Sequence, residues 1–223
     1  HQPISGNKIA SLSCSGGEAS LIADLAEQFN FSFPKLSSKQ KRKLKSALGD
    51  LVHLSNPLDY QTYVWNDQAK LTLAFKTMME ETYDFLFIIM DLPKQGRCSS
   101  DSWHPAIAAL KEAKKIAKCP VGLITSLEEN MPEKFAKDLI KHSIIPLTGL
   151  ENSLAAVKAL QNVSIQWKIK STPSIIWERW PNEKSRVLDE YQSKKVLSRI
   201  GINVPKGFVI TDKNSLLNKF RTI

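Results

Sequence analysis

The chain has 223 residues, of which 42% are hydrophobic, and it carries a formal net charge of +9 at pH 7. This length allows one large domain, or one medium domain and part of another, with enough apolar side chains for a sizeable core. There is no apolar run of the length that a membrane span needs, and no basic segment followed by an apolar one at the start, so we expect neither a membrane partner nor a secretory signal.

The first predicted element is a strand over residues 8–14, which leads through a Ser/Gly turn into a helix over residues 18–29. A strand that ends in such a turn aims the free N–H groups and the positive dipole end of the helix at the turn. This makes the turn a candidate phosphate-binding site, and the alternative is a tight turn that only lets the helix pack close to the sheet. The turn residues are Ser13, Cys14, Ser15, Gly16 and Gly17.

Two of the neighbouring side chains have simple interpretations. Glu18 lies in the first turn of the predicted helix, where a carboxylate suits the dipole, and we expect a capping and supporting role. A nucleophilic role for Cys14 is disfavoured, because no histidine partner is evident.

The next segments are shorter and more polar. Residues 31–33 alternate as a short second strand would, and residues 37–48 predict a helix whose basic residues form a solvated face. The loop Asn56-Pro57-Leu58-Asp59 follows, in which Pro57 forces Asn56 away from helical geometry. Asn56 and Asp59 are candidate supporting residues near the turn, and the alternative is that they only cap turns.

The remaining part of residues 1–162 alternates strands and helices. Five strands in alternation with helices predict an α/β, doubly wound parallel sheet, close to the flavodoxin-like order 2-1-3-4-5. In that order the loops after strands 1 and 3, residues 13–18 and 91–103, meet at the carboxyl edge of the sheet. The further strands are expected at 85–90, 120–125 and 144–147, and the further helices at 67–83, 104–117, 132–142 and 150–161.

The C-terminal part has a different character. Residues 163–185 are predicted to form a linker, and residues 186–223 to contain a helix at 186–200, a short strand at 208–210 and the start of a helix at 214–221. This last segment is too short to bury its own core, so we expect the opening of a second domain. Residues 166–223 carry most of the excess positive charge, but no nucleic-acid-binding motif accompanies it, and we expect no nucleic-acid partner.

Metal-ligand spacing is absent from the sequence. The three cysteines have no CxxC spacing, which argues against a disulfide framework and a zinc site and favours a reducing, cytoplasmic setting. None of the four histidines has metal-ligand spacing either, so we predict no metal site.

Two sets of residues resemble the NDP-forming acyl-CoA synthetases, the relatives of succinyl-CoA synthetase and ADP-forming acetyl-CoA synthetase. Ser15-Gly16-Gly17 after Lys8-Ile9-Ala10, followed by Asn56-Pro57-Leu58-Asp59, is similar to the second flavodoxin-like ligase domain of that family. Residues 188–197 and Gly201-Ile202-Asn203-Val204-Pro205 are similar to the opening of its ATP-grasp domain. The two sets in this order are much more specific than either alone.

The resemblance implies a middle fragment of an enzyme that converts acid, CoA and ATP to acyl-CoA, ADP and phosphate through acyl phosphate and phosphohistidine. The helix after the turn would hold the phosphoryl group in a cradle of residues 13–17, with Asn56 and Asp59 positioning the incoming histidine loop. No histidine here has the family's phosphohistidine context, so that loop would precede His1 and the fragment alone would be inactive, with no catalytic residue of its own.

The same resemblance implies cofactors and partners. ATP and Mg would act in the full-length protein with CoA as a substrate, and none of them is expected bound to this fragment. The partners would be the CoA-binding, phosphohistidine and ATP-grasp domains of the same synthetase, and a homo-oligomer remains open.

Two other interpretations are compatible with the turn. The first is a flavodoxin-like FMN-binding module, in which Tyr60, Trp65 or Trp103 would sandwich the flavin. The second and weaker one is a receiver-type signalling domain with Asp91 as phosphate acceptor, which is disfavoured because strand 1 ends without an acidic pair and strand 5 without a lysine.

Overall fold

The computed structural model describes residues 3–94, 96–169, 187–212 and 216. The chain divides into two compact units, His1–Thr172 and Pro173–Ile223. In the described parts of the chain, the helices are all too short or too polar to cross a membrane.

The first unit is built on a five-stranded parallel sheet in the order β2-β1-β3-β4-β5. This confirms the predicted α/β class and strand order. β1, β3 and β4 are buried along their whole length, as expected for apolar strands that are covered on both faces. The strands are β1 Ile9–Ser13, β2 Leu58–Asp59, β3 Phe85–Ile89, β4 Val121–Thr125 and β5 Ile145–Thr148.

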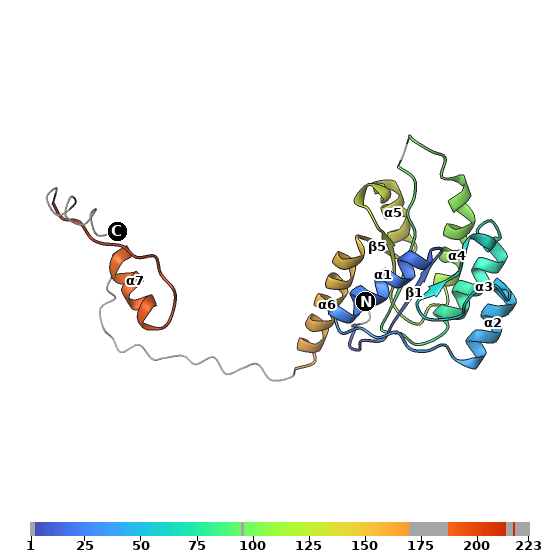
Figure 1. Ribbon diagram of the computed structural model, residues 1–223, viewed down its shortest axis with the longest axis horizontal. Helices are drawn as coiled ribbons and strands as arrows, with labels where there is room; N and C mark the ends of the chain where they lie inside the picture. The colour runs from blue at the N-terminus through green and yellow to red at the C-terminus, as the bar shows by residue number, and fades with distance from the viewer. Residues whose placement is uncertain (1–2, 95, 170–186, 213–215, 217–223) are drawn as a thin grey trace. The chain divides into compact units, whose positions relative to one another are not determined.

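Helices cover both faces of this sheet (Figure 1). The α1 and α6 helices pack on one face through Ile22 and Leu154, and the other four helices of the unit pack on the opposite face. The two faces therefore have separate hydrophobic cores, with the sheet between them. The helices are α1 Gly16–Gln28, α2 Ser38–Leu48, α3 Gln68–Met79, α4 His104–Lys114, α5 Glu133–Lys141 and α6 Leu150–Gln166, with single 3-10 turns at Thr62–Val64, Asp101–Trp103 and Glu128–Asn130.

The second strand is not the segment that the sequence predicts. Residues 31–33 contribute only one isolated bridge, between Lys8 and Ser32. The strand at this edge is Leu58–Asp59, which pairs with Leu12 and Ser13 of β1. The prediction was wrong because a two-residue strand leaves no periodic pattern in the sequence.

The side chain of Asn56 lies along β1, between the Lys8–Ser32 bridge and the pairing of β1 with β2. Its Oδ1 accepts a hydrogen bond from the Ser11 amide at 3.2 Å. Its Nδ2 donates to the carbonyl oxygens of Ile9 and Pro34, each at 3.1 Å. A side-chain amide thus takes the place of strand backbone and satisfies polar groups of β1 that would otherwise be unpaired.

The basic residues of α2 lie on its solvent side, as predicted. Leu44, Ala47 and Leu48 are buried, whereas Lys43 forms an ion pair with Glu80 at 2.7 Å. The run of positive charge in this helix is therefore the outer face of a core helix.

The second unit, described from residue 187 to 212, contains α7 Glu190–Arg199. None of the residues described in this unit is buried. The predicted strand over residues 208–210 is wrong, since a strand needs a neighbour to pair with and the described part of the unit offers none. The α6 helix extends to Gln166, past the predicted start of the linker; residues 170–185 and most of the predicted helix at 214–221 lie outside the described residues.

Candidate functional site

The predicted turn lies where β1 meets α1. The Ser13 hydroxyl donates to the carbonyl oxygen of Ser15 at 3.0 Å, which closes the turn. Ser15 is the N-cap residue in extended conformation, and its side chain accepts no capping hydrogen bond. The amides of Gly16, Gly17 and Glu18 have no acceptor among the described residues. These free donors at the positive end of a helix are what the sequence predicts for an anion site.

A cavity of about 400 Å³ borders this turn. It brings together the loops after β1 and β3, as predicted, and adds the segment after β2. Sequence reasoning considered Asp91, Trp65 and Trp103 only under other functions, although Asp91 is the first charged residue after the buried β3. The lining residues are Cys14, Glu18, Thr62, Trp65, Asn66, Met90, Asp91 and Trp103.

Asp59 lies directly beside the N-terminus of α1. A Cβ atom placed on Gly16 would lie 3.3 Å from its Oδ2. The backbone amide of Gln61 donates to Oδ1 at 2.9 Å, and the side-chain amide of Gln61 donates to Oδ2. Both oxygens of Asp59 are therefore hydrogen-bonded, and Gly16 is the residue that leaves room for them.

Asp91, which follows β3, is fixed in a similar way. Its Oδ1 accepts from the Ser126 amide at 2.7 Å and from Asn130 Nδ2 at 3.0 Å, and its Oδ2 accepts from the Ser126 hydroxyl. Charged carboxylates are stabilised by donors of this kind. The site thus contains two carboxyl groups that accept hydrogen bonds on both oxygens, one on β2 and one after β3.

Glu18 differs from these two acids. No described residue donates to its Oε2, which is buried, and the capping hydrogen bond expected of this side chain is not formed. Burial, and then the charges of Asp91 and Asp59, raise the pKa of Glu18 from 4.5 to about 7. At neutral pH this carboxyl group is therefore protonated in a large fraction of molecules.

The thiol of Cys14 is not activated by the helix. Burial raises its pKa to about 11, and the nearby charges of Glu18, Asp59 and Asp91 act in the same direction. A thiol in this state is a poor nucleophile.

The aromatic residues near the cavity contact one another. Tyr60 is fully buried and so presents no face to a ligand, and it stacks on Trp65 with ring centroids 6.4 Å apart. Trp65 meets Trp103 edge to face at 90°. Tyr60 and Trp65 are parallel to within 7° but stack on each other, and Trp103 is perpendicular to Trp65, so the rings do not form the two open parallel walls that a flavin sandwich would require.

Asn56 lies outside the lining of the cavity. Its Oδ1 and Nδ2 are engaged by backbone groups of β1 and of Pro34. The role that its geometry supports is fixing the strand that carries the turn, and contact with a histidine loop stays a prediction.

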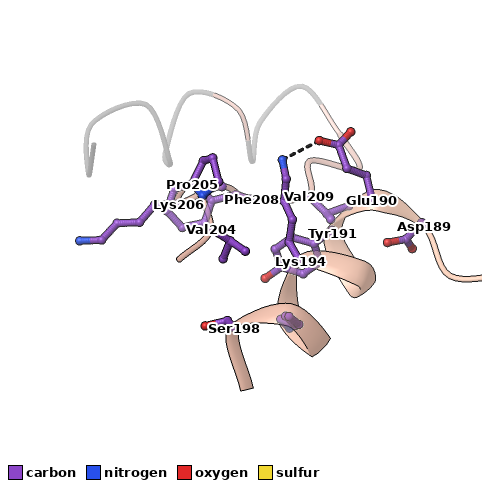
Figure 2. Close-up of a pocket in the computed structure, with 12 residues that line it drawn as sticks. Asp189, Glu190, Tyr191, Lys194, Ser198, Val204, Pro205, Lys206, Phe208 and Val209 are labelled. Atoms are coloured by element: carbon purple, nitrogen blue, oxygen red, sulfur yellow. Dashed lines mark hydrogen bonds and ion pairs between the residues drawn. The ribbon is translucent and has the colours of Figure 1, made fainter. Parts of the chain in front are cut away.

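The second unit has a cavity of its own, of about 630 Å³, between α7 and residues 204–209. Figure 2 shows the ion pair in which Lys194 contacts Glu190, at 2.5 Å. Lys195 Nζ lies 4.5 Å from the centre of the Tyr191 ring. Lys194 and Lys195 of α7 therefore already have partners within the unit.

The described residues include no group of three or more His, Cys, Asp or Glu side chains arranged to hold a metal ion. Glu18, Asp59 and Asp91 are thus neighbours without being a metal site. The site offers backbone N–H donors, two carboxyl groups that accept hydrogen bonds on both oxygens, and Glu18, whose pKa is raised to about 7.

Comparison with known proteins finds solved structures whose fold is similar to that of this chain. No family model and no curated protein matches the chain. Among solved structures, PH0766 from Pyrococcus horikoshii OT3 is similar to it with a TM-score of 0.59 and 23% identity, over 75% of this chain and 38% of that one.

A second similar protein is the dinucleotide-forming acetyl-coenzyme A synthetase 1 of Ca. Korarchaeum cryptofilum. Its apo form gives a TM-score of 0.53 at 15% identity, over 76% of this chain and 37% of that one. Its complex with phosphate and ADP gives 0.54 at 15% identity, over 77% and 37%. The chain thus spans well under half the length of these proteins, and at these identities the likeness shows a shared fold.

Proposed function

We propose that the chain is the middle part of an NDP-forming acyl-CoA synthetase, which joins an acid to CoA at the expense of a nucleoside triphosphate. In this role the N-terminus of α1 binds a phosphoryl group that is carried on a histidine of another domain. The observation that carries the proposal is the open turn, in which the amides of Gly16, Gly17 and Glu18 have no acceptor among the described residues.

Three further observations support the proposal. The turn lies at the carboxyl edge between β1 and β3, the switch point where doubly wound sheets bind ligands. The order of the motifs along the chain resembles that family. One of the proteins with a similar fold is an acetyl-coenzyme A synthetase, and one of its structures is a complex with phosphate and ADP.

The chemistry of this part of the enzyme is electrostatic. Backbone donors that are fixed before the ligand arrives stabilise negative charge without reorganisation, which favours phosphoryl transfer. The carboxylates of Asp59 and Asp91 repel a free anion and attract a ring N–H, so an imidazole that carries the phosphoryl group suits the site better than free phosphate does. ATP, Mg, CoA and the phosphorylated histidine would be supplied by other domains, and the chain alone would form no acyl-CoA.

The experiment is a titration of the ¹⁵N-labelled chain with N-phosphoimidazole, followed in ¹H–¹⁵N correlation spectra. We expect the resonances of Gly16 and Gly17 to shift, because their amides contact the phosphoryl group. Imidazole without phosphate is the matched ligand control, and FMN tests the flavin alternative. Unchanged turn resonances with phosphoimidazole would contradict the proposal, and shifts with FMN alone would favour the alternative.

The variant Ser15→Asp places a carboxylate at the N-cap of α1, next to the free amides. A carboxylate at the N-cap position accepts from the free amides and occupies the space of the ligand, as Asp does at other helix starts. We expect the affinity for phosphoimidazole to fall about tenfold or more. Ser37→Asp, at the N-cap of α2, is the matched control and should bind as the unmodified chain does; equal affinity of all three proteins would exclude binding at this turn.

A further inference from the structure

The three acids at the turn present an electrostatic problem for the function proposed above. A phosphoryl group carries negative charge, and it would enter a cavity bordered by Glu18 and Asp91, with Asp59 beside Gly16. In the described part of the chain, no lysine, arginine or histidine lines this cavity. Backbone donors alone must then offset up to three negative charges.

The three acids differ in the hydrogen bonds that their carboxyl oxygens accept. Asp59 and Asp91 each accept hydrogen bonds on both oxygens, which stabilise their charged forms. Glu18 has no such donors at Oε2, which is buried without a partner in the described residues. Among the three acids, Glu18 is therefore the one with a buried oxygen that lacks a donor, and its pKa is raised to about 7.

The groups that face Glu18 come from the ends of three strands. They are the Cys14 thiol after β1, Asp59 at the end of β2, with the adjacent Tyr60, and Asp91 after β3. Together with burial, the charges of Asp91 and Asp59 raise the pKa of Glu18 to about 7. The pKa values of Cys14 and Tyr60 are also raised, so both stay neutral and remove no proton from Glu18.

The side chain of Glu18 lines the cavity, and its buried Oε2 has no donor among the described residues. The hydroxyl of Tyr60 is also unpartnered among the described residues, but Tyr60 does not line the cavity. A buried polar atom normally has a partner, so an unpartnered carboxyl oxygen beside a cavity indicates a polar group that binds there.

We propose that Glu18 binds the phosphoryl group in its protonated form and donates a hydrogen bond to a phosphoryl oxygen. Binding above neutral pH then takes up one proton from solvent, and that proton stays on the Glu18 carboxyl group. Apart from the O–H bond of this proton, no covalent bond forms or breaks in the step. The inference rests on the proposed function of the turn and adds the group that adjusts its charge.

Sulfate is the probe for this proposal, because it is a tetrahedral dianion whose charge stays constant over the pH range of the test. Phosphate titrates close to neutral pH and would obscure the result. The 223-residue chain is titrated with sulfate at about pH 6 and about pH 8.5, with the amide resonances of Gly16 and Gly17 as the readout. Calorimetry in two buffers with different ionisation enthalpies counts the protons taken up.

The expected affinity falls about 30-fold from pH 6 to pH 8.5, since binding is linked to one proton on a group with a pKa of about 7. Glu18→Gln keeps a donor without a charge, so it should bind at both pH values as tightly as the unmodified chain does at pH 6. Glu18→Ala should also be independent of pH but bind more weakly than Glu18→Gln. Glu151→Gln, in the exposed first turn of α6, is the matched control and should keep the full pH dependence.

The outcomes separate the two proposals. Sulfate binding that is tight and independent of pH in the unmodified chain, without proton uptake, overturns the role of Glu18 and leaves the anion site standing. Equal affinities of Glu18→Gln and Glu18→Ala overturn the donated hydrogen bond. No sulfate binding by the unmodified chain or by Glu18→Gln at either pH overturns this inference, whereas the proposed function is overturned only if N-phosphoimidazole also leaves the resonances of Gly16 and Gly17 unchanged.

Discussion

The first backbone amides of α1 and of α2 have no acceptor within the helix, and the two N-termini differ in how they satisfy these amides. At α2 the Ser37 hydroxyl accepts from the Gln40 amide at 3.2 Å, and the Gln40 side chain accepts from the Ser37 amide at 2.9 Å. At α1 the N-cap side chain of Ser15 accepts nothing, and two glycines follow it. The difference teaches that one helix start is closed by its own side chains, whereas the other leaves its donors free, as the proposed anion site requires.

The largest effect on stability is expected from removing the side chain of Asn56, which holds the strand that leads into the turn at α1. Asn56→Ala removes the side chain that pairs with Ser11 and Ile9, and it leaves polar groups of β1 without partners. We expect the free energy of unfolding to fall by about 2–3 kcal/mol, measured by urea denaturation followed by circular dichroism. Asn162→Ala, at an exposed position of α6, is the control; equal losses in both variants would show that Asn56 has no special role in holding β1.

The two N-caps can be compared directly by the same substitution. Ser37→Ala breaks the reciprocal capping hydrogen bonds of α2 and should lower the free energy of unfolding by about 1 kcal/mol. Ser15→Ala removes no capping hydrogen bond and should change it by less than about 0.5 kcal/mol. Thermal and urea denaturation of both variants give the comparison, and a larger loss at Ser15 than at Ser37 would mean that the α1 terminus is closed after all.

A further effect on stability depends on pH. The pKa of Glu18 is raised from 4.5 to about 7, so the folded chain binds this proton more tightly than the unfolded chain does. The resulting stability is fully present below about pH 4.5 and is lost as the pH rises through about 7. Because Glu18 is partly exposed, Glu18→Gln should be more stable than the unmodified chain at high pH by only about 1 kcal/mol.

The measurement is urea denaturation at about pH 5 and about pH 8, with Glu151→Gln as the matched control. We expect the advantage of Glu18→Gln to grow with pH and that of Glu151→Gln to stay flat. A variant at Glu18 that is less stable than the unmodified chain at high pH would show that this carboxylate stabilises the helix terminus, as Glu in a first turn usually does.

The sequence predicts much of this fold because its longest signals are reliable. The apolar runs of β1, β3 and β4 and the apolar spacing of α3 and α4 all lie where they are expected. The second strand is missed because Asn56, a single polar residue, replaces backbone pairing that a pattern of apolar residues would reveal. The strand predicted at 208–210 fails for a related reason, since pairing depends on a partner that the described part of the second unit does not contain.

The location of the candidate site could be predicted from the sequence, but the raised pKa of Glu18 could not. The Ser/Gly turn and the meeting of the loops after β1 and β3 follow from topology, and the structure brings them together. The titration of Glu18 does not follow from topology, because it depends on which acids receive donors. Gln61, Ser126 and Asn130 provide those donors from three different loops, and no spacing in the sequence indicates that Glu18 receives none.

The raised pKa of Cys14 has a consequence for the behaviour of the chain under oxidative stress. Peroxides and alkylating reagents attack thiolates, and a thiol with a pKa of about 11 is almost entirely protonated at neutral pH. Cys119 is buried and has a similarly raised pKa, whereas Cys98 is exposed. Burial, and after it the neighbouring carboxylates, therefore protect the sulfur atom at the turn, so we expect oxidation to modify the exposed Cys98 before Cys14.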